Sequence, residues 1–225
     1  MENNKNSFST ERKLSDPESF VGELEYVDRS RQDDYELFEQ EKNEALRLAY
    51  VDKQTDCYNR NYYERLTERL DYDKYDGDII FILIDINDLG LVNNEQSYGA
   101  GDNLIKNMSI QLRNQLDVSP IANKIDFSEL EKGDTIPVRI GGDEFAVIRL
   151  KTEQEKNDPN FETNFDDAIG AKIYERKPKG LNFAWGFTTF NKDFDKDFYD
   201  TRNRAGIVMH EQKRAMKGLE NNSPY

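Results

Sequence analysis

The residues best suited to chemistry in this chain of 225 amino acids are three carboxylates at the ends of predicted strands. Asp85 follows the apolar run 79–84, and Asp143 and Glu144 follow two glycines that separate two further apolar segments. If these segments are neighbours in one sheet, the three carboxylates converge. Carboxylates this close repel one another unless a cation lies between them, so the pattern predicts bound Mg²⁺. Two such ions activate a hydroxyl for attack and stabilise a leaving pyrophosphate, which is the layout of a nucleotidyl-transfer palm.

Each part of this pattern also has a plainer explanation. An Asp at the end of a strand, such as Asp85, commonly caps the segment that follows it. A Gly-Gly-Asp sequence is commonly only the loop of a β-hairpin, because glycines permit the positive φ angles of a tight turn. Neither part decides between structure and catalysis by itself.

The composition excludes several other classes of function. Asp and Glu total 45 against 31 Lys and Arg, a net charge of -14, so we expect no binding to nucleic-acid duplexes. His210 is the only histidine, which excludes His-clustered metal sites and argues against a Ser-His-Asp hydrolase. Cys57 is the only cysteine, so no internal disulfide forms. Because the longest apolar run has six residues, we expect no membrane span and a cytoplasmic protein.

The elements that must position the carboxylates follow from hydrophobic periodicity. Helices are expected over about 20–51, 61–70, 101–116, 165–174 and 200–217, and strands over 79–84, 135–140, 145–150 and 181–190. The run 79–84 is continuously apolar, so this strand is covered on both faces. The order of the elements predicts an α/β fold with a mixed, mostly antiparallel sheet flanked by helices.

The chain divides into four expected parts. These are a disordered polar tail (1–18), an N-terminal helical segment (19–51), a compact domain (52–218) and a C-terminal tail (219–225), with an insertion at 117–134 inside the domain. The helical segment has a three-four spacing like that of a coiled-coil seam at Tyr35, Phe38, Lys42, Ala45 and Ala49. The spacing covers too few heptads to distinguish a coiled coil from a helix that packs on its own domain.

A family resemblance joins these observations. The segment Gly141-Gly142-Asp143-Glu144-Phe145 is letter for letter the signature of the GGDEF domain family, the diguanylate cyclases. Four further motifs occur in the family's order: Asp52 to Arg60, Asp85 to Asp102, Trp185-Gly186, and Arg204-Ala205 followed by Lys213. The resemblance covers about 46–218 and implies the family's polymerase-palm, ferredoxin-like fold.

The resemblance also implies roles for individual residues. Asp85 and Asp143 would hold two Mg²⁺ ions, with Mn²⁺ as an alternative, helped by the backbone carbonyl of Ile86. Glu144 would be a further metal ligand or a carboxylate that handles a proton in catalysis. Asn93 and Asp102 would read the edge of guanine and reject adenine, which has a lone pair where guanine has N1–H. Lys213 and Lys217, four residues apart on one helix, would hold the triphosphate, unless they simply form a solvated face.

The reaction implied is condensation of two GTP into cyclic di-GMP with release of pyrophosphate. Each domain would carry one GTP, so two copies of the chain must pair as a homodimer. Two alternatives remain at this point: a catalytically inactive module that binds GTP or a protein partner, and a related palm polymerase that makes another oligonucleotide.

The sequence also departs from the family pattern. Asn87 and Leu89-Gly90 stand where a second Asp and Phe-Lys are usual, and Gln54 stands where a Leu is usual in the first motif. Lys132 to Thr135 lacks the family's Arg-x-x-Asp product-inhibition motif. We therefore expect no feedback binding of cyclic di-GMP at that segment.

Overall fold

The computed structural model describes residues 17–116, 118, 131–169 and 173–222. Most of the expected N-terminal tail, most of the expected insertion and the last three residues lie outside this range. The chain forms two compact units, Met1–Ala45 and Leu46–Tyr225. Helix α1 (Pro17–Tyr50) supplies the described part of the first unit and begins two residues before the helical segment expected from the sequence. Tyr35 and Phe38 are exposed on it, and the coiled-coil interpretation stays a prediction.

The second unit is built on a four-stranded sheet with the order β2-β3-β1-β4. The strands are β1 (Ile79–Ile86), β2 (Thr135–Arg139), β3 (Glu144–Leu150) and β4 (Phe183–Thr189). All three strand pairings are antiparallel, and an isolated parallel bridge joins Tyr58 to Val138. The predicted fold class, a mostly antiparallel sheet flanked by helices, is confirmed.

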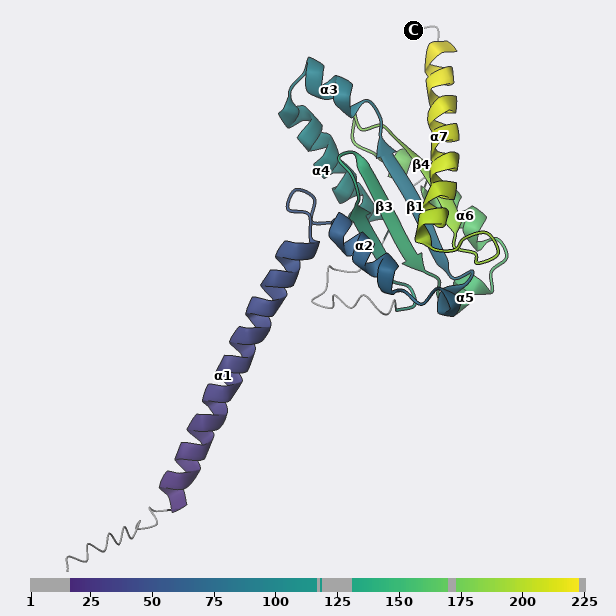
Figure 1. Cartoon of the computed structure of the whole chain (residues 1–225). Helices are drawn as coiled ribbons and strands as arrows, with labels where there is room; N and C mark the ends of the chain where they lie inside the picture. Colours follow the sequence, from purple (N-terminus) through teal and green to yellow (C-terminus); the bar gives the residue numbers. More distant parts are fainter. Residues whose placement is uncertain (1–16, 117, 119–130, 170–172, 223–225) are drawn as a thin grey trace, which may run out of the picture. The chain divides into compact units, whose positions relative to one another are not determined.

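Helices cover both faces of this sheet (Figure 1). One core packs α2 (Arg60–Arg69) and α7 (Phe198–Asn222) against side chains such as Phe81 and Ala146. The other packs α4 (Tyr98–Gln115) and α6 (Phe161–Ile169) against Ile82 and Phe145. All eight residues of β1 are buried. The strand is continuously apolar because both of its faces are covered, as predicted.

Short elements that the sequence did not predict connect these parts. A 3₁₀ turn spans Tyr72–Tyr75, α3 spans Leu89–Glu95 and α5 spans Glu153–Lys156. Helix α3 follows directly on β1 and packs against α4. It begins after Asp88, whose φ of 60° lies in the left-handed region. The chain therefore turns sharply between the end of β1 and the first residues of α3.

The backbones of β4 and α7 come unusually close at Gly186. A Cβ added to Gly186 would lie 1.9 Å from the carbonyl oxygen of Ala205 and 2.7 Å from the backbone nitrogen of Met209. No side chain fits there, so only glycine permits this approach. Ala205 and Met209 are themselves fully buried, which fixes one face of α7 on the sheet.

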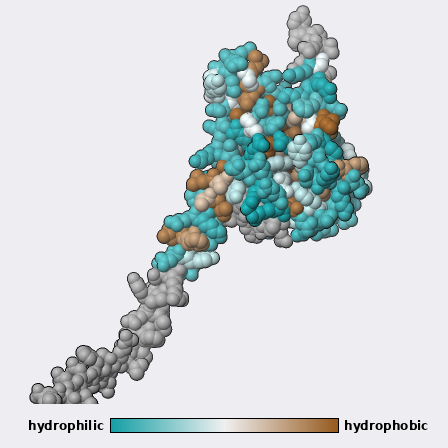
Figure 2. Space-filling model, viewed as in Figure 1, coloured by the Kyte–Doolittle hydropathy of each residue, from teal (hydrophilic) through white to brown (hydrophobic). Residues whose placement is uncertain are grey.

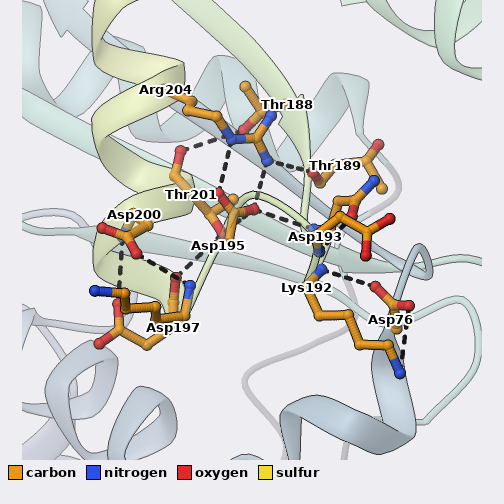
Figure 3. Close-up of polar contacts among 12 residues, drawn as sticks. Asp76, Thr188, Thr189, Lys192, Asp193, Asp195, Asp197, Asp200, Thr201 and Arg204 are labelled. Carbon is orange, nitrogen blue, oxygen red and sulfur yellow. Dashed lines mark hydrogen bonds and ion pairs between the residues drawn. The ribbon is translucent and has the colours of Figure 1, made fainter.

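An ion pair between a buried carboxylate and a partly exposed arginine fixes the start of α7 (Figure 3). The carboxylate of Asp195 is fully buried and accepts hydrogen bonds from Nε of Arg204 at 2.7 Å, from the Thr201 hydroxyl at 3.0 Å and from the Asn191 backbone at 3.0 Å. Burial acts to raise the pKa of Asp195, but these hydrogen bonds outweigh it and lower that pKa below its ordinary value. Arg204 also donates to the Thr189 carbonyl at 2.7 Å, so the pair ties α7 to the end of β4.

The face of the molecule seen in Figure 2 is mostly hydrophilic, with hydrophobic residues scattered over it. None of the helices in the described ranges combines the length and apolar character needed to cross a bilayer.

Candidate functional site

The sheet brings the first predicted carboxylate to the glycine hairpin. Asp85 on β1 lies opposite Glu144 on β3 in the strand register. The next residue, Ile86, donates its backbone N–H to the carbonyl of Asp143 at 3.1 Å. The hairpin closes because the backbone N–H groups of Ile140 and Gly141 both donate to the Glu144 carbonyl. The backbones of Asp85, Asp143 and Glu144 are thus brought together by strand pairing, although β1 and the hairpin are about 60 residues apart in the sequence.

Two of these carboxylates already have cationic partners. Lys213 on α7 forms an ion pair and a hydrogen bond with Oδ1 of Asp85. Arg202, which lies eleven residues before Lys213 on α7, donates to Oε2 of Glu144 at 3.2 Å. From the sequence, Lys213 is expected to bind phosphate. Arg202 has no expected role, because nothing in the sequence pattern relates α7 to the hairpin.

The donor set has the right chemistry for Mg²⁺, which prefers carboxylate and carbonyl oxygens. In the described ranges, however, no three acidic, cysteine or histidine side chains are gathered closely enough to hold a metal ion. The positive charge that the buried Asp85 carboxylate requires comes from Lys213 instead. A metal at Asp85 would have to displace this lysine, and the ligand set predicted from the sequence stays a prediction.

The two residues predicted to read a base lie side by side where α3 and α4 meet. Asn93 on α3 packs directly against the backbone of Gly101, the residue before Asp102: a Cβ on Gly101 would lie 1.9 Å from Oδ1 of Asn93. That Oδ1 atom is buried and has no hydrogen-bond partner within the described part of the chain. An amide oxygen without a partner is costly, so this position favours a ligand that donates a hydrogen bond.

Asp102 is exposed and is held by Gln54, a residue for which the sequence predicts no role in the site. Nε2 of Gln54 donates to Oδ1 of Asp102 at 2.8 Å, and Oε1 of Gln54 accepts from Arg139 at 2.6 Å. Arg139 also contacts both oxygens of Asp52 and donates to the carbonyls of Gly141 at 3.2 Å and Gly142 at 2.9 Å. A continuous set of hydrogen bonds therefore runs from the hairpin to Asp102.

Lys217, the second predicted phosphate ligand, is exposed one turn after Lys213 on α7. The two lysines thus stand on the same helix, but only Lys213 contacts a predicted metal ligand.

A model of the family described as "Diguanylate cyclase, GGDEF domain" matches residues 49–218, about three quarters of the chain. The chain belongs to the GGDEF domain family. No curated protein matches the sequence significantly. The family assignment agrees with the resemblance of the five motifs and includes the whole described site.

Solved structures of GGDEF proteins share the fold. The coiled coil and GGDEF domain of DgcB from Caulobacter crescentus, in complex with c-di-GMP, is 16% identical with a TM-score of 0.56, over 88% of this chain and 95% of that one. The diguanylate cyclase SiaD from Pseudomonas aeruginosa, in complex with its activator SiaC, is 18% identical with a TM-score of 0.54, over 88% and 72%. Apo LapD from Vibrio cholerae, with S helix, GGDEF and EAL parts, is 15% identical with a TM-score of 0.55.

These likenesses differ in extent. This chain aligns over 78% of its length with LapD but spans only 37% of that structure. At these identities the likenesses establish the fold of the GGDEF domain.

Proposed function

We propose that this GGDEF domain is a diguanylate cyclase, which condenses two GTP molecules into cyclic di-GMP and releases two pyrophosphates. The observation that carries the proposal is the position of Asp85 beside the Gly141–Glu144 hairpin, with Asn93 and Asp102 on the adjoining helices. Family membership makes this reaction the first to test.

Guanine is the base that the two reading residues fit. The carboxylate of Asp102 accepts hydrogen bonds only, so it suits the N1–H and exocyclic N–H₂ donors of guanine. Oδ1 of Asn93 is a buried acceptor without a partner in the described ranges, and it suits a donor as well. Adenine has an acceptor where guanine has N1–H, and that acceptor would face Asp102.

The triphosphate requires positive charge in an acidic protein. Lys213 and Lys217 on α7 supply two cationic groups, and Asp85, Asp143, Glu144 and the Ile86 carbonyl are the groups that would hold Mg²⁺ or Mn²⁺. Such ions, when bound, neutralise phosphate charge and favour ionisation of the attacking hydroxyl. In this chain, release of Lys213 from Asp85 makes both the carboxylate and the lysine available to ligands.

Cyclisation requires two GTP molecules to face each other, because each 3′-hydroxyl attacks the α-phosphate of the other nucleotide. One domain binds one GTP in this proposal, so the reacting species is a homodimer. We expect cytoplasmic GTP to be the substrate. We expect neither nucleic-acid duplexes nor membranes to be partners.

The test is incubation of the full chain with GTP, ATP and Mg²⁺, followed by identification of the products by mass. Cyclic di-GMP from the unaltered chain, and none from Asp143→Ala, is the expected result. GTP binding without product would instead indicate an inactive GTP-binding module. A product that contains adenine would contradict the assignment of Asn93 and Asp102 to guanine.

A further inference from the structure

Gln54 lies in a loop whose backbone is held in place. The loop joins α1 to α2, and Thr55 within it is buried and donates both its backbone N–H at 3.0 Å and its hydroxyl at 2.7 Å to Oδ1 of Asp52. The loop continues into Tyr58, which donates to the Pro137 carbonyl and accepts from the Arg139 backbone N–H. The side chain of Gln54 therefore extends from a fixed point beside β2.

The orientation of the Gln54 amide is set by charge at both ends. Its oxygen faces the guanidinium of Arg139 at 2.6 Å, and its nitrogen faces the carboxylate of Asp102 at 2.8 Å. The flipped amide would present N–H groups to a cation and an oxygen to an anion, so it is excluded. Only a side chain with an acceptor on one side and a donor on the other can occupy this position and satisfy both neighbours.

We propose that Gln54 is a positioning residue that sets the base selectivity of the site by holding the plane of the Asp102 carboxylate. The inference rests on the proposed binding of guanine by Asp102. A carboxylate has about four acceptor sites, and Gln54 uses one of them on Oδ1. The remaining sites stay available to the N–H donors of guanine, while rotation of the exposed carboxylate is restricted.

Arg139 extends this role to the hairpin. It binds Gln54 and the carbonyls of Gly141 and Gly142 at the same time, so the Asp102 carboxylate and the hairpin that carries Asp143 have a common support. The leucine usual in the family's first motif can form neither hydrogen bond of Gln54. This chain thus positions its base-reading carboxylate by a contact that the usual leucine could not make.

Two substitutions separate this role from a merely structural one. Gln54→Leu removes both hydrogen bonds. Gln54→Glu has nearly the same shape and keeps an oxygen for Arg139, but it places a second negative charge against Asp102. If Gln54 positions Asp102, the unaltered chain binds guanine nucleotide most tightly, Gln54→Leu binds it less tightly and Gln54→Glu binds it least tightly. If it only supports Arg139, Glu is tolerated and Leu is the more harmful change.

The measurement is equilibrium binding of slowly hydrolysed GTP and ATP analogues to the full chain in Mg²⁺. Gln54→Leu should lower the ratio of GTP to ATP affinity about tenfold and Gln54→Glu should lower it further, since the contact involves a charged group. Lys53→Leu, at the adjacent exposed position, is the matched control and should leave the ratio unchanged. Thermal unfolding checks that all variants keep the fold.

The outcomes distinguish this inference from the proposed reaction. An unchanged ratio in both variants, or tolerance of Glu with loss in Leu, overturns the role of Gln54 even if cyclic di-GMP is formed. The predicted order without any product overturns the cyclase and leaves the role of Gln54 standing. Equal affinity of the unaltered chain for GTP and ATP overturns the inference together with the guanine assignment.

Discussion

Lys213 and Asp85 form an ion pair across 128 residues of sequence, between α7 and the end of β1. Both side chains are largely shielded, with exposed fractions of 25% and 13%. An ion pair in such surroundings is stronger than one on the surface, and removing one partner leaves the other charge uncompensated. Without ligands, the Lys213 ammonium therefore neutralises the Asp85 carboxylate at the predicted metal site.

This pair predicts competition between the lysine and a metal. Lys213→Met should bind Mn²⁺ about tenfold more tightly than the unaltered chain when no nucleotide is present, because the metal no longer displaces a cation. Titration of the nucleotide-free protein with Mn²⁺, followed by electron paramagnetic resonance, measures this. Lys217→Met is the control, since Lys217 has no contact with Asp85, and its Mn²⁺ affinity should not change. Equal affinities in all three proteins would contradict the prediction.

The packing of Asn93 against Gly101 predicts a second effect. In Gly101→Ala the new methyl group would lie 1.9 Å from Oδ1 of Asn93, so the asparagine must move. We expect GTP affinity to fall at least tenfold, measured by calorimetry, with little change in helix content by circular dichroism. Gly99→Ala lies in the same helical turn, and its methyl group would meet only the Ser97 hydroxyl at 3.7 Å. It should bind GTP normally; a similar loss in both variants would indicate a general effect on α4.

Asp56 occupies a left-handed backbone position, with φ of 53°. Glycine adopts this conformation without steric cost, whereas alanine does not. Asp56→Ala should therefore be about 1 kcal/mol less stable than Asp56→Gly in urea unfolding. Both variants lose the ion pair between Asp56 and Arg113, so the comparison isolates the backbone. Equal stability of the two would show that this residue changes conformation in solution.

The ion pair of the buried Asp195 with Arg204 predicts a dependence of stability on pH. Because the pKa of Asp195 is lowered in the folded state, its contribution is complete above its unfolded pKa of about 4 and is lost as the pH falls further. Asp195→Asn should cost about 2 kcal/mol at pH 7, since it removes the charged hydrogen-bond partner of Arg204, whose own charge is partly exposed to water. Urea unfolding between about pH 5 and pH 2 should show a shallower decline for this variant. Parallel curves for the two proteins would exclude the assigned role.

The segment that replaces the product-inhibition motif is committed to internal contacts. Lys132 pairs with Glu153, and the Thr135 hydroxyl is buried and accepts a hydrogen bond from Arg149 at 2.5 Å. We expect cyclic di-GMP not to bind there with high affinity. Calorimetric titration of the unaltered chain and of Lys132→Ala tests this, and tight binding that the substitution abolishes would refute it.

Much of the fold could be predicted because its signals are local. The apolar run 79–84, the two glycines at 141–142 and the stripe of α4 determine the strand, the hairpin and the covering helix. Helix α3 was missed because it has only seven residues, too few for an apolar stripe to repeat, although Leu89 and Val92 pack partly buried against the core. Helix α5 carried a usable signal in Thr152 and Glu155, which form a capping box.

The site was less predictable than the fold because its contacts join distant segments. The family motifs located Asp85, Asn93 and Asp102, but no spacing rule relates Gln54 to Asp102 or Arg202 to Glu144. Gln54 was recognisable in the sequence only as a departure from the family's usual leucine. Its hydrogen-bond partners emerge once the loop, β2 and α4 are assembled in space.

The close approach at Gly186 has a consequence for how this protein can vary. Lys213 lies eight residues beyond Ala205, about 12 Å along the axis of α7, so its reach toward Asp85 is set by how closely the two backbones meet at Gly186. Any side chain at 186 would push the helix outward and carry both lysines with it. The separation of the charges of Asp85 and Lys213 thus depends on the absence of one methyl group at Gly186, on the face of β4 that packs against α7.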